Sequence, residues 1–189
     1  MTDLEQHIQS YFGVTEDDLA RICTCFEPLT LRKGEYFLKT GWYADRLGFV
    51  QEGLLREYLD VDGKEVTKWI VTPGQFTTDL SSFLFGRPAR VHVQALSDCV
   101  LQVLPQARYR SLPEEVPRWV ELEKLFIAKC FNVLEDRVIS HLSLSAEERY
   151  QQLFQYNRAL FQLVPQQYLA SMLGMTPETM SRLRRKLGT

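Results

Sequence analysis

The sequence predicts an α+β protein, in which an antiparallel β-roll or jelly roll is followed by a long helix and a small helical domain. Short apolar stretches separated by glycines dominate the chain before residue 114. Residues 119–141 then contain neither proline nor glycine, which is typical of one long helix. Near the C-terminus, two short helical patterns flank Gly174. We therefore expect three parts, with boundaries at 1–114, 115–142 and 143–189.

The roll is predicted from short strands with evenly spaced turns. The best-defined hairpin contains Asp62-Gly63, because these two residue types tolerate the positive backbone angles of a two-residue turn. A helix that begins after Thr15 as its N-cap, with acidic residues in its first turn, is expected to lie against the roll. The expected strands are 29–31, 46–50, 54–61, 64–71, 91–96 and 99–104.

The long helix carries two neighbouring apolar stripes, which together need two surfaces to cover them. One stripe has near-heptad spacing and comprises Val120, Ile127, Phe131, Leu134 and Val138. The other comprises Leu122, Phe126, Cys130 and Val133. We expect one stripe to pack on the roll and the other on a second copy of the chain, with Ile127, Phe131, Leu134 and Val138 in the dimer contact. The alternative is one broad face buried within a monomer.

Residues 163–187 predict a helix-turn-helix of the kind that reads DNA. Gly174 can end the first helix in the left-handed conformation, and Thr176 with Pro177 can begin the second as N-cap and first residue. A preceding helix is predicted to begin at a capping box, Ser145-Ala-Glu-Glu. In the last helix one face is apolar, and the other can touch bases through Glu178, Ser181, Arg182 and Arg185.

The charge distribution favours a polyanionic partner for this C-terminal part. The chain has a net charge of −2, yet from Arg158 onward five basic residues face one acidic residue, Glu178. An electropositive tip on an acidic body suits duplex DNA. The alternative reading of the same residues is a helical hairpin with a solvated basic end.

Composition argues against an enzyme or a metal protein. Only His7, His92 and His141 are present, and the four cysteines have neither disulfide-framework nor metal-ligand spacing. The N-terminus lacks a signal-peptide pattern, and no apolar run is long enough to cross a bilayer. We therefore expect a cytoplasmic protein with no membrane partner.

The order of these parts resembles the Crp/Fnr family of bacterial transcription regulators, whose roll is the cyclic-nucleotide-binding fold. In the tail, the resemblance rests on Gly174-Met-Thr-Pro-Glu-Thr-Met-Ser-Arg182. In the roll it rests on Leu31-Arg-Lys-Gly-Glu-Tyr, Gly41, Phe49-Val-Gln-Glu-Gly-Leu, Asp62-Gly-Lys-Glu and Pro73-Gly-Gln-Phe. It implies a homodimer that binds double-stranded DNA, with a small-molecule effector and RNA polymerase as further partners.

By this resemblance, Glu178 and Arg182 match the base-contacting pair, and Gln167, Thr176 and Thr179 match positions that face the phosphate backbone. Pro177 departs from the family, which often has a base-reading arginine there, and Arg185 is the residue that could take over this contact. The chain ends where many relatives continue into a β-hairpin wing, so the resemblance implies a wingless domain with fewer phosphate contacts.

The resemblance is weaker at the sensor. Relatives that bind cyclic AMP carry Gly-Glu-Leu and, about ten residues later, Arg-Ser-Ala or Arg-Thr-Ala; here the counterparts are Thr78-Asp-Leu and Ala89-Arg-Val. Arg90 is one residue late, which on a strand turns a side chain to the opposite face. The candidate ligand residues are Asp79, Leu80, Arg87, Ala89, Arg90 and Asn132. Cyclic AMP, another ligand and a ligand-free roll remain open, as does a signalling module whose tail binds a protein instead of DNA.

Overall fold

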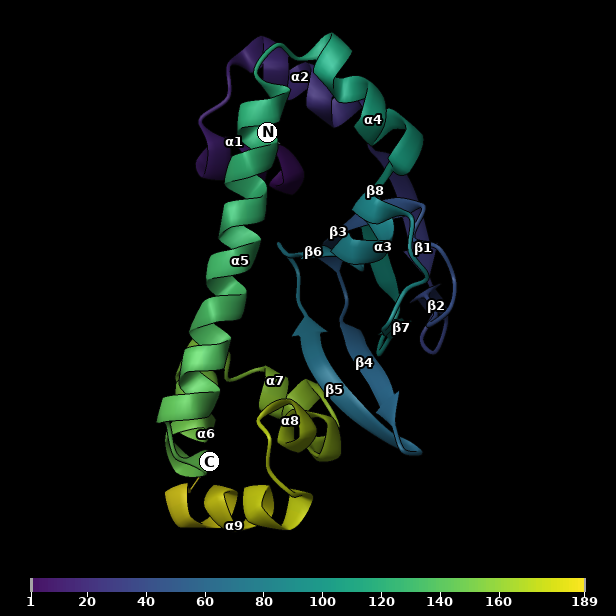
Figure 1. Cartoon of the computed structure of the whole chain (residues 1–189). Coiled ribbons are helices and arrows are strands. Elements are labelled where there is room, and N and C mark those ends of the chain that lie inside the picture. The colour runs from purple at the N-terminus through teal and green to yellow at the C-terminus, as the bar shows by residue number, and fades with distance from the viewer. Residues whose placement is uncertain (1, 189) are drawn as a thin grey trace.

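The computed structural model describes residues 2–188, with the side chains of Tyr11 and Phe12 left out of the description. Two four-stranded antiparallel sheets form the roll (Figure 1). The first sheet has the order β1 (Glu27–Leu31), β8 (Cys99–Pro105), β3 (Arg46–Glu52) and β6 (Phe76–Thr77). The second has the order β2 (Tyr36–Leu38), β7 (His92–Ala95), β4 (Leu55–Val61) and β5 (Lys64–Val71).

The predicted hairpin is confirmed. Val61 pairs with Lys64, and the two turn residues between them, Asp62 and Gly63, have φ values of 52° and 76°. These positive angles match the right-handed twist of the strands, which is why Asp-Gly suits this turn. The six expected strands are present, whereas β2 and β6 were not predicted because three and two residues are too few to show an alternating pattern.

Three helices gather at one end of the roll (Figure 1). They are α1 (Asp3–Phe12), α2 (Glu16–Thr24) and α4 (Gln106–Glu115), and a fourth, α3 (Leu80–Phe85), lies between β6 and β7. The predicted cap of α2 is confirmed, because the Thr15 hydroxyl accepts a hydrogen bond from the backbone N–H of Asp18. Leu4, Ile8 and Ile22 bury the apolar faces of α1 and α2 in the core of the roll.

The helix α5 (Trp119–Ser143) runs along one side of the molecule, from the N-terminal helices to the C-terminal domain (Figure 1). Leu122 is buried, and Phe126 packs half-buried against the same core. Val133, expected on this stripe, is exposed instead. Between residues 2 and 188, no helix is both long enough and apolar enough to span a bilayer.

The C-terminal domain contains α6 (Ala146–Tyr156), α7 (Leu160–Leu163), α8 (Gln166–Met172) and α9 (Pro177–Leu187). The predicted capping box at the start of α6 is present between Ser145 and Glu148. The core of this domain includes Leu54 and Ile70 from the roll, so the two parts of the chain pack as one body. As a result, α9 lies across the end of the molecule farthest from α1 and α2 (Figure 1).

Candidate nucleic-acid interface and sensor segment

A tight turn joins α8 to α9, and its geometry is set by three residues. Gly174 has a φ of 65°, the left-handed conformation that the sequence predicts. The Thr176 hydroxyl then accepts a hydrogen bond of 3.2 Å from the backbone N–H of Thr179, and Pro177 is the first residue of α9. The start and direction of α9 are therefore fixed by local chemistry.

The two faces of α9 divide as the sequence predicts. Met180 and Leu183 are buried against the rest of the domain. Of the seven residues proposed from the sequence to face DNA, Thr179 is half-buried and the other six are exposed: Gln167, Thr176, Glu178, Ser181, Arg182 and Arg185. The structure thus places all seven on α8, α9 or the turn between them.

Glu178 and the basic residues of α9 differ in how they are held. The Glu178 carboxyl accepts hydrogen bonds from the backbone N–H of Glu178 and from Thr176. These bonds hold the pKa of the carboxyl below its ordinary value, so Glu178 is an ionised acceptor. Lys186 bonds to both carboxylate oxygens of Glu147, at 3.0 and 2.7 Å, which ties α9 to α6. Arg182 and Arg185 remain exposed on α9.

Basic side chains from α5 and α6 hold the end of α8. Arg137 of α5 donates to the carbonyl of Met172 at 2.8 Å, and Arg149 of α6 donates to the carbonyl of Leu173 at 2.9 Å. Cations suit the C-terminal end of a helix, where carbonyls lack partners within the helix. Sequence reasoning missed both arginines, because nothing in the local sequence indicates that they reach carbonyls more than twenty residues away.

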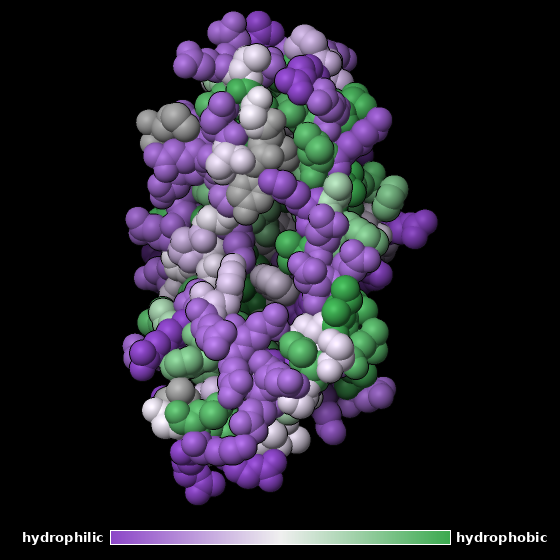
Figure 2. Space-filling view, turned by 90° about the vertical axis from the view of Figure 1, so that its left-hand side faces the viewer, coloured by the Kyte–Doolittle hydropathy of each residue, from purple (hydrophilic) through white to green (hydrophobic). Residues whose placement is uncertain are grey.

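The heptad-spaced stripe of α5 is exposed. The face that carries α5 shows hydrophobic patches among hydrophilic residues (Figure 2). Phe131 is 61% exposed, and the other stripe members are exposed as well: Val120, Ile127, Leu134 and Val138. A row of large apolar side chains in solvent is a feature of surfaces that associate.

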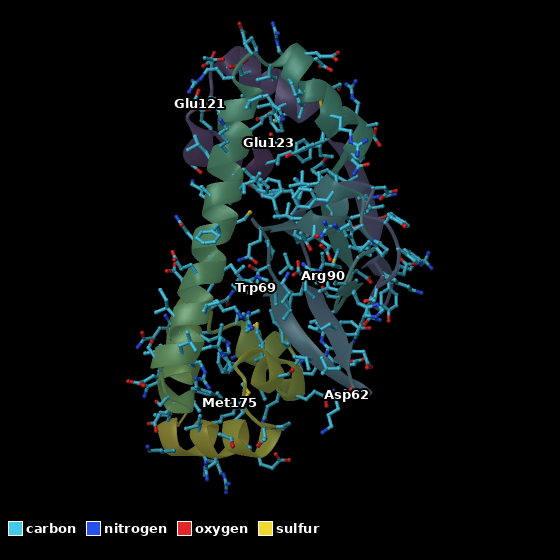
Figure 3. The ribbon with its side chains drawn as sticks, viewed as in Figure 1. Asp62, Trp69, Arg90, Glu121, Glu123 and Met175 are labelled. Atoms are coloured by element: carbon cyan, nitrogen blue, oxygen red, sulfur yellow. The ribbon has the colours of Figure 1, made fainter. Side chains whose placement is uncertain are left out.

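In the sensor segment, Asp79 is buried and both of its carboxylate oxygens are engaged. Oδ1 accepts from the backbone N–H of Ser82 and so caps α3, and Oδ2 accepts from the backbone N–H of Arg90 at 2.8 Å. The Arg90 side chain is 78% exposed, and it lies on the surface of the roll near α3 (Figure 3). Its Nε is 3.9 Å from Oδ2, too far for a hydrogen bond.

The other proposed ligand residues do not converge on one pocket. Ala89 is buried, Leu80 is half-buried, and Arg87 is exposed with its guanidinium 5.8 Å from the ring of Phe85. Asn132 is exposed on α5, and at 100° per residue it is about 120° around the helix from the half-buried Phe126. The structure therefore brings together Asp79 and Arg90, with Ala89 next to Arg90 in the chain.

Polar side chains lie in the part of the roll beside α5, and sequence reasoning missed them. The buried Glu57 accepts from Lys68 at 2.9 Å and from Thr77 at 2.8 Å. Trp69, which lies between the roll and α5 (Figure 3), has the Arg137 guanidinium 5.1 Å from its ring centre. Burial lowers the pKa of Arg137. The only signal in the sequence was the presence of charged residues, Glu57 and Lys68, within predicted strands.

A cavity of about 40 Å³ lies where α4 and α5 meet the roll. Its lining is mostly apolar but includes Tyr109 and Glu123 (the latter labelled in Figure 3), and the Tyr109 hydroxyl donates to Glu123. This volume is far below the roughly 300 Å³ at which ligand pockets begin. Across residues 2–188, no group of three His, Cys, Asp or Glu side chains is placed to hold a metal ion.

Comparison with known proteins identifies the roll. The family model of the cyclic nucleotide-binding domain matches residues 28–115, the span from β1 to α4. A search of curated protein sequences finds no match. Residues 28–115 are therefore similar to the cyclic nucleotide-binding domain, and α5 and a helical C-terminal region follow them.

Solved structures of Crp/Fnr-type regulators share this fold at low sequence identity. FixK2 of Bradyrhizobium japonicum is 20% identical with a TM-score of 0.72, over 86% of this chain and 84% of that one. The c-di-GMP-responsive global regulator CLP of Xanthomonas campestris is 18% identical with a TM-score of 0.65, over 90% of each chain. The catabolite activator protein of Thermus thermophilus is 20% identical with a TM-score of 0.58, over 94% of this chain and 85% of that one.

Proposed function

We propose that the protein is a homodimeric, sequence-specific DNA-binding transcription regulator of the Crp/Fnr type. The observation that carries the proposal is the exposed face of α9, where Glu178 and Arg182 stand one helical turn apart. The capped start of α9 and its buried opposite face leave these two side chains exposed on the side that can enter a major groove. The fold shared with Crp/Fnr-type regulators supports the same reading.

The chemistry of this face fits base reading. Arg182 can donate two hydrogen bonds to O6 and N7 of guanine, and the ionised Glu178 can accept one from N4 of cytosine. Arg185 extends the face along the groove, and Ser181 lies beside Arg182. Around this pair, side chains that can contact phosphates or sugars position the helix: they are Gln167, Thr176 and Thr179.

The exposed stripe of α5 supports a dimer. Pairing two copies through Ile127, Phe131, Leu134 and Val138 would cover this stripe and present two α9 helices to two half-sites. A dimer also strengthens DNA binding, because the two half-sites are bound together.

For the sensor, we propose a roll whose cyclic-nucleotide site is degenerate. Asp79 uses both oxygens within the protein, and Arg90 faces solvent instead of clamping a phosphate. The effector is then a different small molecule, or the roll acts without one. A cytoplasmic location and RNA polymerase as a partner follow from the proposed role in transcription.

Salt-dependent binding to duplex DNA tests the proposal. Sequences selected from a random duplex pool should contain two similar half-sites, and log affinity for them should fall linearly with log salt concentration. The selection is repeated with a metabolite extract to expose an effector. If no duplex is enriched and binding to duplex DNA is absent at low salt, the C-terminal domain binds a protein instead.

A further inference from the structure

Arg56 of β4 joins the roll to α8 through a stacked arrangement of three side chains. Its side chain is only 2% exposed, although it carries a charge. The guanidinium carbon lies 4.2 Å from the ring centre of Tyr58 and 3.7 Å from that of Tyr168, so the group sits against one ring from the roll and one from α8. Such contacts between a guanidinium and aromatic faces gain strength when water is excluded.

The position of the guanidinium is fixed by hydrogen bonds within the roll. Its Nη1 donates to Glu65 at 2.6 Å, and its Nε donates to the Thr67 hydroxyl at 2.9 Å. Tyr58 is fixed as well, because its hydroxyl lies 3.0 Å from that of Tyr36. Arg56 is thus held from the roll side, and its contact with Tyr168 reaches the C-terminal domain.

A second contact joins the roll to α8, this time from β5. The backbone N–H of Thr67 donates to the Ser171 hydroxyl of α8 at 2.9 Å. Because β5 is the outermost strand of its sheet, this N–H has no neighbouring strand to bond. Buried apolar residues from both sides, among them Ile70 and Leu169, lie in one cluster around these contacts.

We propose that Arg56 is a positioning residue for operator recognition, because it sets the orientation of α8 and, through α8, that of α9. This inference rests on the proposed function. In a dimer, the distance between two half-sites is set by the separation and angle of the two α9 helices. The contacts of α8 with β4 and β5, made through Arg56, Tyr168 and Ser171, fix these quantities, and loss of these contacts lets each α9 reach half-sites at other spacings.

The test measures spacing preference with the full-length protein. Duplexes carry the selected half-sites at the selected spacing, with one base pair added or removed, or as a single half-site. Arg56→Met removes the guanidinium but keeps much of the volume, and Tyr168→Leu removes the ring. The controls are Tyr168→Phe, which keeps the ring, and Arg46→Met, which removes an arginine that is ion-paired to Asp45 on the other sheet.

Arg56→Met and Tyr168→Leu should each reduce the preference for the selected spacing by about threefold or more, with single half-site affinity within about twofold of the unmodified protein. Tyr168→Phe and Arg46→Met should keep the preference. A purely structural role would instead weaken binding to every duplex equally, and that outcome would overturn the inference.

Circular dichroism and melting curves establish that each variant is folded. If Arg56→Met fails to fold, the spacing preference is measured on Tyr168→Leu and Ser171→Ala, which remove the contacts that α8 makes with the roll. Folded variants that keep the unmodified spacing preference overturn the inference and leave the proposed function standing. If the unmodified protein binds no duplex, the proposed function fails first, and the inference fails with it.

Discussion

The backbone N–H of Arg90 donates a hydrogen bond to the buried carboxylate of Asp79, while the side chain of Arg90 extends into solvent. The Asp79 side chain is thus bonded to the backbone of Arg90, and the guanidinium of Arg90 is turned away from the interior of the roll. When no arginine faces the site, a bound phosphate lacks its strongest contact, which is the pair of charge-assisted hydrogen bonds from a guanidinium.

We therefore expect cyclic AMP and cyclic GMP to bind no more tightly than high micromolar. Since a ligand raises the melting temperature by mass action, millimolar nucleotide should shift Tm only slightly. Arg90→Ala should show the same small shift. A large shift in scanning calorimetry that Arg90→Ala abolishes would show that residues 86–90 rearrange to bring Arg90 inward.

The limits of sequence reasoning are clearest around Arg56. Four consecutive residues of β4 are buried, from Leu55 to Tyr58, whereas alternation along a strand predicts two. Both faces of β4 are covered, because Leu55 lies in the core of the roll and Arg56 packs against the ring of Tyr168 from α8. Covering of the second face depends on a helix more than a hundred residues later in the chain, so the burial of Arg56 could not be read from β4 alone.

By contrast, the turn before α9 was predictable because its signals are local. Gly174, Thr176 and Pro177 act through their own backbone preferences, and each has the conformation that the sequence predicts. Helix α1 had a similar signal, a capping box between Thr2 and Glu5, but it was not used in the prediction. Long-range contacts such as Arg137 with Met172 have no such signal.

Arg182 is expected to read a base. Arg182→Ala should weaken binding to the selected operator by about 1 to 3 kcal/mol and binding to random duplex much less, because only the operator offers the matching guanine. Equilibrium binding to both duplexes measures this difference. The control is Arg118→Ala: Arg118 pairs with Glu121 at the end of the molecule opposite α9 (Figure 3) and should leave both affinities unchanged. An equal loss on both duplexes would place Arg182 on a phosphate.

Phe131 is expected to lie in the dimer contact. Phe131→Glu puts a charge into the apolar stripe of α5, so it should shift the protein to monomer and weaken binding to a two-half-site operator. Sedimentation or light scattering at micromolar concentration measures the change. Leu125→Glu is the matched control, since Leu125 is also exposed but lies about 120° around α5 from Phe131. A monomeric unmodified protein would contradict the role given to this stripe.

Acidification is expected to destabilise the fold through histidine. The pKa of His141 is lowered by burial and by the nearby Arg137 and Arg149, and the pKa of His7 is lowered by burial and by Lys129. The unfolded chain therefore takes up protons first as pH falls below about 6.5. Stability should be full above this pH and decrease below it.

Melting temperatures between about pH 7.5 and 5.5 measure this effect. His141→Gln should remove part of the pH dependence, because glutamine does not titrate and its amide can replace the hydrogen bond that the His141 imidazole makes with the backbone of Met172. His7→Gln should remove another part. If both variants lose stability on acidification as steeply as the unmodified protein, other groups are responsible.

Gly53 is expected to tolerate no side chain, unlike a second glycine of similar conformation. Both Gly53 and Gly63 have positive φ, at 87° and 76°, so alanine at either position costs about 1 to 2 kcal/mol of backbone strain. A Cβ at Gly53 would also lie 2.3 Å from the carbonyl oxygen of Asp98, whereas none of the nearby atoms comes within 4 Å of one at Gly63. Urea unfolding should therefore show a loss for Gly53→Ala that exceeds that for Gly63→Ala by roughly 1 to 3 kcal/mol, the usual cost of overpacking. Equal losses would mean that the turn between β3 and β4 moves away from Asp98 at little cost.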